Sequence, residues 1–263
     1  MYTNLVILPC HAIWKGGVEL GETRDEWHLV NFQIDGYDHL AFKDHIIQSI
    51  DYIKSKPESF LIISGGQTKV ESGPISESLS YYQLATNLIE DEHKHSILSR
   101  MSTEEHARDS FENVIFSICR FYELFNRYPE AITIIGFEFK RERFLTYHLD
   151  KALRFPLHKV EYVGNSPTPK DFSKPDQERY FKELDDSEYR FAVKFFEQDW
   201  YGIKKPLASK KSTRNPFKRS HGYAQSNPQL TKFLTILQQE DIDISNEEVR
   251  QLLIDLPWIC TTE

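Results

Sequence analysis

Short apolar runs that end at glycine, proline or polar residues predict the strands of a buried sheet. The clearest run covers residues 60–63 and leads directly into Ser64, Gly65, Gly66 and Gln67. Further strands are predicted at residues 5–8, 131–135 and 160–163, with a weaker candidate at residues 96–98. Most of these runs are rich in β-branched residues and lack polar alternation, which is typical of strands covered on both faces.

Amphipathic helices are predicted between these strands, because apolar side chains recur there at spacings of three and four residues. The predicted helices cover residues 38–54, 75–89, 111–125 and 141–154. The third helix has two possible start points. Ser102 with Glu105 fits a capping box, and so does Asp109 with Glu112. Strands that alternate with helices predict an α/β fold, here a three-layer Rossmann-like fold with a mainly parallel sheet.

The pattern changes near residue 168, where several prolines form a linker-like stretch. We therefore expect a Rossmann-like α/β core over residues 1–168 and a mostly helical C-terminal extension over residues 169–263, packed on that core. Helices are predicted in the extension at residues 187–198 and 246–256. Between them lies a basic loop, residues 204–219, which carries seven Lys or Arg residues and no acid.

The overall composition favours a soluble cytoplasmic protein. Net charge is −8, which argues against non-specific binding to nucleic acid. The three cysteines are far apart and fit neither a disulfide framework nor a zinc site, so a reducing compartment is favoured; they are Cys10, Cys119 and Cys260. No apolar stretch long enough for a membrane span is found, and no His or carboxylate spacing indicates a metal site.

The predicted fold brings distant loops together. Right-handed crossovers place the C-terminal ends of parallel strands at one edge of the sheet, where ligands of such folds bind. His11, the loop at residues 64–67, and the segments 100–113 and 138–143 all follow or adjoin those ends. The irregular connection at residues 14–36 has the length of a binding loop and leaves the same edge.

An anionic ligand would suit the residue types at this edge. We predict that backbone amides of Gly65 and Gly66 cradle the anion, that Arg108 and Arg143 hold it, and that Asn113 orients it. The predicted ligand-binding residues are Ser64, Gly65, Gly66, Gln67, Glu77, Arg108, Ser110, Asn113, Lys140 and Arg143. Glu112 and His11 are the candidates for acid–base catalysis.

Each of these residues also fits a purely structural role. Gly65 and Gly66 suit a tight turn that needs glycine for packing. The carboxylate of Glu112 suits a helix start, and His11 suits a hydrogen-bonded structural position. Lys140 and Arg143 suit an ordinary solvated basic face. The Gly-x-x-x-x-Gly-Lys-Ser/Thr and Gly-x-Gly-x-x-Gly patterns are both absent, so neither a Walker loop nor standard dinucleotide binding is predicted.

Three segments together resemble the SanA/ElyC-like domain-of-unknown-function family (family 218), especially its eukaryotic, fungal branch. They are residues 60–67, residues 107–113 and residues 134–144. Ser110 stands where the family's Thr-x-Glu-Asn signature usually has Thr, and Arg143 matches the family's Arg. The resemblance covers roughly residues 5–165 and implies a Rossmann-like fold without a settled reaction. Lys140 lies where many bacterial relatives carry His, which puts any mechanism based on that His in doubt.

The leading functional prediction is an intracellular protein that binds a phosphorylated or nucleotide-type small molecule and acts as an enzyme of unassigned reaction. The alternative is a non-catalytic ligand sensor, since no complete nucleophile, base and orienting group is seen. A second alternative is RNA binding through the basic loop 204–219. That loop is also predicted either to be solvated or to fold back and supply cations to the cleft. No cofactor is indicated.

Overall fold

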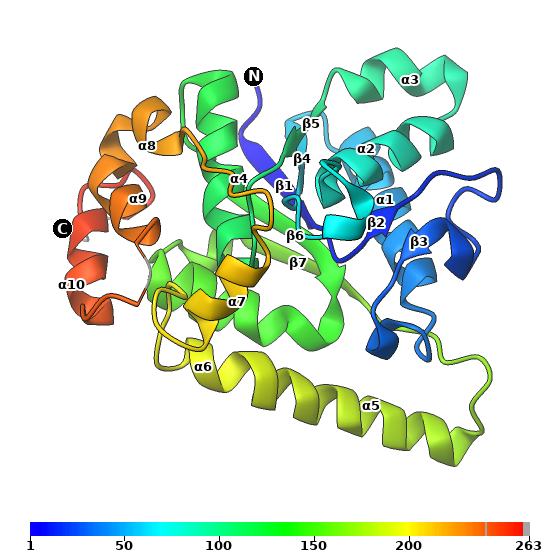
Figure 1. Cartoon of the computed structure of the whole chain (residues 1–263). Helices are drawn as coiled ribbons and strands as arrows, with labels where there is room; N and C mark the ends of the chain where they lie inside the picture. The colour runs from blue at the N-terminus through cyan, green and yellow to red at the C-terminus, as the bar shows by residue number, and fades with distance from the viewer. Residues whose placement is uncertain (240, 260–263) are drawn as a thin grey trace.

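A parallel five-stranded sheet forms the centre of the protein in a computed structural model that describes residues 1–239 and 241–259 (Figure 1). The strands are β1 (Asn4–Pro9), β4 (Ser59–Ser64), β5 (Met101–Glu104), β6 (Ala131–Phe137) and β7 (Val160–Asn165). Their order is β5-β4-β1-β6-β7, and all four pairings are parallel. The order reverses between β1 and β6, as in Rossmann-like sheets. The predicted α/β fold is confirmed.

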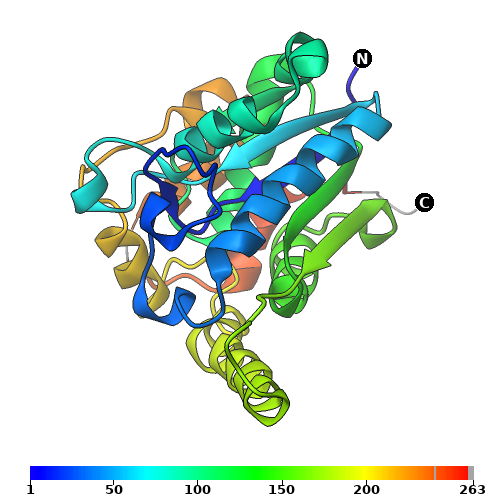
Figure 2. The ribbon, with the colours of Figure 1, turned by 90° about the vertical axis from the view of Figure 1, so that its right-hand side faces the viewer.

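Helices cover both faces of the sheet and make three layers (Figure 2). The helices α1 (Asp38–Ser55) and α2 (Glu77–Leu88) lie on one face, and α4 (Ser110–Phe125) lies on the other. In β1, Val6 and Leu8 pack toward α1 and α2, whereas Leu5 and Ile7 pack toward α4. This alternation follows from the two-residue period of a strand. Each of these buried side chains stabilises the fold by roughly 1.5–3 kcal/mol.

The start of α4 is set by Asp109, whose carboxylate accepts a hydrogen bond of 2.8 Å from the backbone N–H of Glu112. The competing start is wrong, because Ser102 lies within β5. Only half of the predicted capping box forms, since the Glu112 carboxylate accepts from the N–H of Arg108 rather than from that of Asp109. This exchange ties the loop after β5 to the first turn of the helix.

The strand predicted at residues 96–98 is also wrong. These residues end the helix α3 (Asp91–Leu98), and the edge strand β5 follows it. Asp91 and Glu92 occupy the first helical turn, where negative charge is favourable. Ile97 is the single buried residue of α3, and a helix can bury one apolar side chain as well as a strand can. A short apolar pair therefore did not distinguish between the two structures.

The connection at residues 14–36 contains more structure than its sequence predicts. The short strands β2 (Ile13–Trp14) and β3 (Trp27–His28) pair antiparallel, and short 3-10 turns lie before and after β3. Glu26 is buried and accepts hydrogen bonds from the Gly21 and Glu19 amides and from the Trp14 indole. These bonds hold the segment against α2, since the Trp14 amide also donates to a serine of that helix.

The C-terminal part is helical and shares one apolar cluster with α4. A π-helical segment (Arg143–Ala152) follows β6. The later helices are α5 (Lys174–Glu188), α6 (Lys194–Phe196), α7 (Leu207–Thr213), α8 (Tyr223–Ser226), α9 (Thr231–Leu237) and α10 (Asn246–Arg250). Phe111 of α4 packs against Tyr201 and Phe233, which joins the extension to the core. No helix in residues 1–239 and 241–259 combines the length and the apolar composition needed to cross a bilayer.

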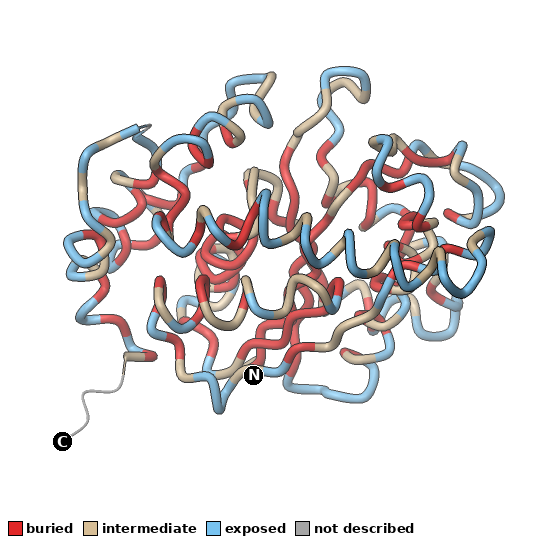
Figure 3. Tube along the Cα trace, turned by 90° about the horizontal axis from the view of Figure 1, so that it is seen from below, coloured by how far each residue is buried: buried red, intermediate tan, exposed pale blue. Residues whose placement is uncertain are grey.

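The helix α5 differs from the others because none of its residues is buried. It lies across one side of the molecule and leads, through a π-helical turn (Tyr189–Val193), into α6. Figure 3 shows buried residues concentrated in the sheet and in the helices that flank it, rather than in such outlying segments. Cys10 and Cys119 are buried free thiols, and Cys260 lies outside the described residues.

Candidate functional site

A cavity of about 640 Å³ opens at the C-terminal edge of the sheet. It lies at the point where the strand order reverses, because His11 follows β1 and Phe137 and Lys140 end or follow β6. The start of α4, the outer helix α5 and the basic helix α7 complete its wall. Ligands of open α/β sheets bind at this kind of reversal. The fold therefore places the cavity where a ligand is expected.

The predicted site residues divide between the cavity wall and the structure behind it. The wall contains His11, Glu77, Arg108, Ser110, Asn113, Lys140 and Arg143. Ser64, Gly65, Gly66, Gln67 and Glu112 are not part of this wall. The loops predicted to meet at one edge do meet there, but the Gly-Gly turn and Glu112 stand behind the surface that a ligand would contact.

The amides of Gly65 and Gly66 already have acceptors within the protein. Gly65 donates to the Glu104 carbonyl over 3.0 Å, and Gly66 donates to the Ala107 carbonyl over 2.8 Å. A Cβ added at Gly66 would lie 2.7 Å from the Ala107 carbonyl oxygen, closer than packed atoms allow. The predicted cradle of free amides therefore does not form at these two glycines. Close packing explains both of them, because Gly66 lies against the loop after β5 and a Cβ added at Gly65 would lie 2.8 Å from Cys10 Cβ and 2.9 Å from Glu77 Cβ.

Ser64, Gln67 and Asn113 brace the same turn. Asn113 donates to the Ser64 carbonyl over 3.0 Å, and the Ser64 hydroxyl donates to the Glu104 carboxylate over 2.7 Å. The Gln67 side chain donates to the carbonyl of Pro74. Burial raises the pKa of Glu104 to about 7, against the lowering effect of the Ser64 hydrogen bond. These contacts fix the end of β4 relative to α4.

Glu112 is fully buried between two cations. Its carboxylate accepts two hydrogen bonds from the Arg108 guanidinium, the shorter over 2.6 Å, and lies 3.5 Å from the Lys211 ammonium. Burial alone would raise the pKa of Glu112, but Lys211 and Arg108 outweigh it and hold the pKa below its ordinary value. A carboxylate held ionised by two cations accepts protons poorly. This geometry indicates a structural role for Glu112, whose ion pair with Lys211 attaches α7 to α4.

His11 and Lys140 form a half-buried pair at the reversal point. The Lys140 ammonium donates to His11 Nδ1 over 3.3 Å, and His11 Nε2 is buried without a hydrogen-bond partner. Burial, then the charge of Lys140, holds the pKa of His11 well below its ordinary value, so this imidazole is neutral. Burial also lowers the pKa of Lys140 to about 7. Asp38 lines the same cavity, and burial raises its pKa to about 7.

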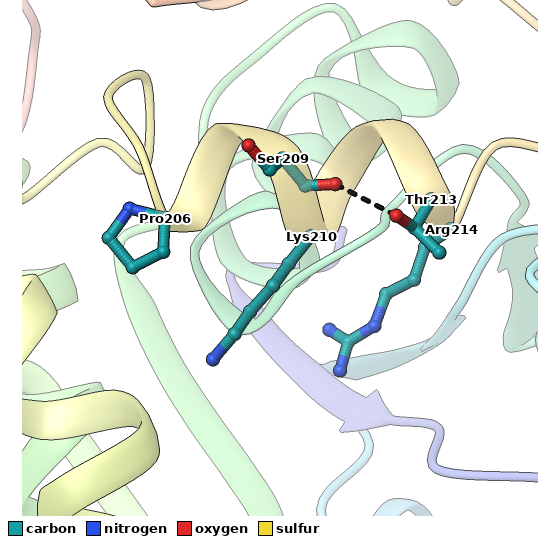
Figure 4. Close-up of a pocket in the computed structure, with 5 residues that line it drawn as sticks. All are labelled: Pro206, Ser209, Lys210, Thr213 and Arg214. Atoms are coloured by element: carbon teal, nitrogen blue, oxygen red, sulfur yellow. Dashed lines mark hydrogen bonds between the residues drawn. The ribbon is translucent and has the colours of Figure 1, made fainter.

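Positive charge at the cavity comes from segments far apart in the sequence. Arg143 lines the cavity and pairs with Glu188 over 2.9 Å. Within residues 1–239 and 241–259, Lys140, Lys210 and Arg214 line it without any carboxylate at ion-pair distance. Figure 4 shows Lys210 and Arg214 leaving the same side of α7, where Lys210 donates to the Phe191 carbonyl. Arg214 donates to the Arg108 carbonyl over 3.0 Å.

Two further predicted residues face the cavity from other elements. The Ser110 hydroxyl lies 2.7 Å from His148 Nε2, and burial holds the pKa of His148 well below its ordinary value. Glu77 accepts a hydrogen bond from the Thr68 hydroxyl, and burial raises its pKa. Both side chains sit where helix starts meet the cavity wall. They add neutral or weakly charged polar groups beside the cations.

Sequence reasoning missed Asp38, Lys210 and Arg214. The basic segment was predicted mainly as a solvated loop, with folding back onto the cleft as the alternative. Residues 207–213 form α7, and Lys210 of this helix and Arg214 directly after it line the cavity. The sequence contained one signal, the helical spacing of Leu207, Ala208 and Lys211. In the structure all three are buried on one face of α7. Aromatic residues of the wall were missed as well, because they come from separate elements; they include Phe32, Phe139, Tyr180, Phe191 and Phe196.

One group of side chains in the described part of the chain has the spacing of possible metal ligands. The group whose ligand atoms approach within 4.8 Å of one another consists of Glu90, Glu92 and His93, and all three are exposed. They lie at the start of α3, and none of them lines the cavity. Exposed acidic groups of this kind are common on solvated helices, so we assign them no function.

The fold and the site define a Rossmann-like α/β protein with a cavity at the strand-order reversal that is lined by charged and aromatic side chains. The chain belongs to the family of the uncharacterized protein YOR238W of Saccharomyces cerevisiae. The two are 36% identical over 264 aligned positions, which cover 85% of this chain and 87% of the yeast protein. No family model matches the sequence, and no solved structure matches it.

Proposed function

We propose that this protein binds an anionic small molecule of the phosphorylated or nucleotide type in the cavity at the end of β1 and β6. One observation carries the proposal: Lys140, Lys210 and Arg214 converge on this cavity without carboxylate partners among the described residues. Clustered like charges repel one another, and the pKa of Lys210 is lowered by burial and then by Arg214. An anion placed between them would relieve this repulsion.

The apolar part of the wall favours a ligand with a planar ring. Phe139, Tyr180 and Phe191 line the cavity, and Phe32 and Phe191 are largely exposed there, at 74% and 61%. Exposed aromatic faces beside cationic groups suit a nucleobase or another ring, because stacking on an aromatic side chain contributes roughly 1–3 kcal/mol per base. A cavity whose wall combines cations with aromatic rings therefore supports a nucleotide-type ligand.

The three motifs at residues 60–67, 107–113 and 134–144 support placing this family within the SanA/ElyC-like proteins, in their fungal branch. All three motifs surround the cavity or brace its wall. Because that resemblance implies no settled reaction, the ligand class rests on the cavity rather than on the resemblance.

An enzyme is the leading candidate within this proposal, and a non-catalytic sensor is the second. The sensor hypothesis is supported by Glu112, because its carboxylate is paired with two cations and does not line the cavity. The enzyme hypothesis is supported by the His11–Lys140 pair, which does line the cavity. RNA binding through residues 204–219 loses support, because Lys211 is buried and Lys210 and Arg214 face the cavity.

Titration calorimetry with ADP, pyrophosphate and inorganic phosphate tests the proposal. We expect wild-type protein to bind at least one of them, and we expect Arg214→Gln to weaken that binding by roughly tenfold, since a hydrogen bond to a charged group contributes about 1.5 kcal/mol or more. The matched control is Arg219→Gln, which removes an exposed arginine of the same segment outside the cavity. It should leave affinity unchanged.

Two results would count against this proposal. One is that none of the three anions binds to the wild-type protein. The other is that Arg219→Gln weakens binding as much as Arg214→Gln, which would indicate a general surface charge effect. Chromatography of the bound nucleotide after incubation then separates the two candidates. Conversion of the nucleotide favours the enzyme, and recovery of unchanged nucleotide favours the sensor.

A further inference from the structure

Lys140 has surroundings unlike those of an ordinary surface lysine. Its ammonium lies 5.1 Å from the ring centre of Phe137 and 5.5 Å from that of Phe139. Its hydrogen-bond acceptor is His11 Nδ1, a neutral imidazole nitrogen. Within the described part of the chain, no carboxylate approaches it to ion-pair distance. The side chain is thus held by aromatic rings and a neutral acceptor at the wall of the cavity.

The charged and titratable groups that face Lys140 come from every element packed around it. They are His11 after β1, Asp38 and His45 of α1, Glu77 of α2, Arg143 of the π-helical segment, Glu188 of α5 and Arg214 after α7. Burial has the largest effect on the pKa of Lys140 and lowers it to about 7, and Arg143 lowers it further than any other charge. Near neutral pH a large fraction of this amine is therefore unprotonated and has a free lone pair.

A lysine in this state is a nucleophile. Desolvation in an apolar pocket and a neighbouring cation are the two arrangements that activate lysine toward carbonyl carbon. Both are present at Lys140, through Phe137, Phe139 and Arg143. The cations that would bind a phosphate stand around the same cavity, so a phosphorylated carbonyl compound would present its carbonyl group to this amine.

We propose that Lys140 forms an imine with an aldehyde or ketone group carried by a phosphorylated ligand. This inference rests on the proposed anion-binding function of the cavity. The Lys140 nitrogen attacks the carbonyl carbon, a C–N bond forms, and the C–O π electrons move to oxygen. The nitrogen loses two protons, both of which pass to that oxygen, and the oxygen leaves as water; His11 Nδ1, 3.3 Å from the nitrogen, relays the first of them and keeps neither. The step needs no oxidant or reductant.

Other lysines near the cavity lack this combination. The Lys211 ammonium is 3.5 Å from the Glu112 carboxylate and also donates to the Tyr201 carbonyl. Lys210 donates to the Phe191 carbonyl over 2.7 Å, at the outer side of the cavity. Lys69 also lines the cavity, and among these four lysines Lys140 is the one that interacts with the imidazole of His11 within the described residues. Selectivity among the lysines is therefore a property that an experiment can measure.

The test uses pyridoxal 5′-phosphate, an aldehyde that carries a phosphate, followed by borohydride reduction and peptide mass spectrometry. We expect Lys140 of the wild-type protein to be labelled at least tenfold faster than Lys210, with a labelling rate whose pH midpoint lies near 7. Lys140→Arg should abolish the fast labelling. Lys218→Arg, which alters an exposed lysine outside the cavity, should leave it unchanged. The comparison of Lys140 with Lys210 in the wild-type protein tests the proposal even if the Lys140 variant fails to fold.

Pyridoxine 5′-phosphate separates failure of this inference from failure of the proposed function, because it has the phosphate but an alcohol in place of the aldehyde. It should protect Lys140 from labelling by competition. Binding of pyridoxine 5′-phosphate together with equal labelling of Lys140 and Lys210 would overturn the imine and leave the anion site intact. No binding of either compound would overturn the imine, and the anion site as well if ADP, pyrophosphate and inorganic phosphate also fail to bind.

Discussion

Replacing Glu112 by glutamine is expected to lower the free energy of unfolding by about 3–5 kcal/mol, because the change leaves the buried Lys211 ammonium beside an uncharged side chain and removes the ion pair with the half-buried Arg108. Glu112 is fully buried, and both Arg108 and Lys211 contact its carboxylate directly. The loss should appear as a lower midpoint in urea unfolding followed by far-ultraviolet circular dichroism.

Glu123→Gln is the matched control for this prediction. Glu123 lies on the same helix and pairs with Arg120 over 2.9 Å at the surface, where an ion pair contributes less than about 1 kcal/mol. If Glu112→Gln kept wild-type stability but abolished conversion of a bound ligand, the structural part assigned to Glu112 would be wrong. Its predicted role in acid–base catalysis would then stand.

Substitution of His45 by glutamine is expected to change how stability depends on pH. His45 is fully buried in α1 and contacts Asn165 at the end of β7. Burial lowers its pKa to about 3. As pH falls below the unfolded value near 6.5, the unfolded chain takes up a proton at His45 that the native chain does not. Wild-type stability therefore declines there, relative to the variant.

The expected size is about 2 kcal/mol between pH 7 and pH 5, since each pH unit below about 6.5 contributes about 1.4 kcal/mol. Urea unfolding of both proteins at the two pH values gives the measurement. Because the other titrating groups are common to both chains, the change in the stability difference isolates His45. A stability difference that is equal at pH 7 and pH 5 would contradict the prediction.

The sheet was predictable because most of its strands have a recognisable local sequence pattern. The apolar runs at residues 5–8, 60–63 and 131–135 all lie within buried strands, and the glycines after residue 64 mark a close turn. The edge strand β5 was not recognised, since Ser102 and Thr103 at its centre are only partly buried. Edge strands bury fewer side chains, so their sequences carry a weaker pattern.

The cavity was predictable in position but not in composition. Parallel topology places the strand ends together, and His11 and Lys140 meet for that reason. The inward turn of Lys210 and Arg214 depends on contacts between α7 and α4, of which the pair between Lys211 and Glu112 is the central one. No local spacing encodes a contact between residues this distant in sequence. A run of positive charge gives the same signal whether it faces solvent or a ligand.

The outer helix α5 gives the cavity a wall that is separable from the hydrophobic core. It contributes Tyr180, Glu183 and Leu184 to the cavity, yet it buries no residue of its own. Its displacement would expose little apolar surface to water, so the free-energy cost of opening this side is small compared with that of unfolding the sheet. A guest molecule would thus exchange through the α5 side, and amide hydrogen exchange in α5 should be faster than in α4.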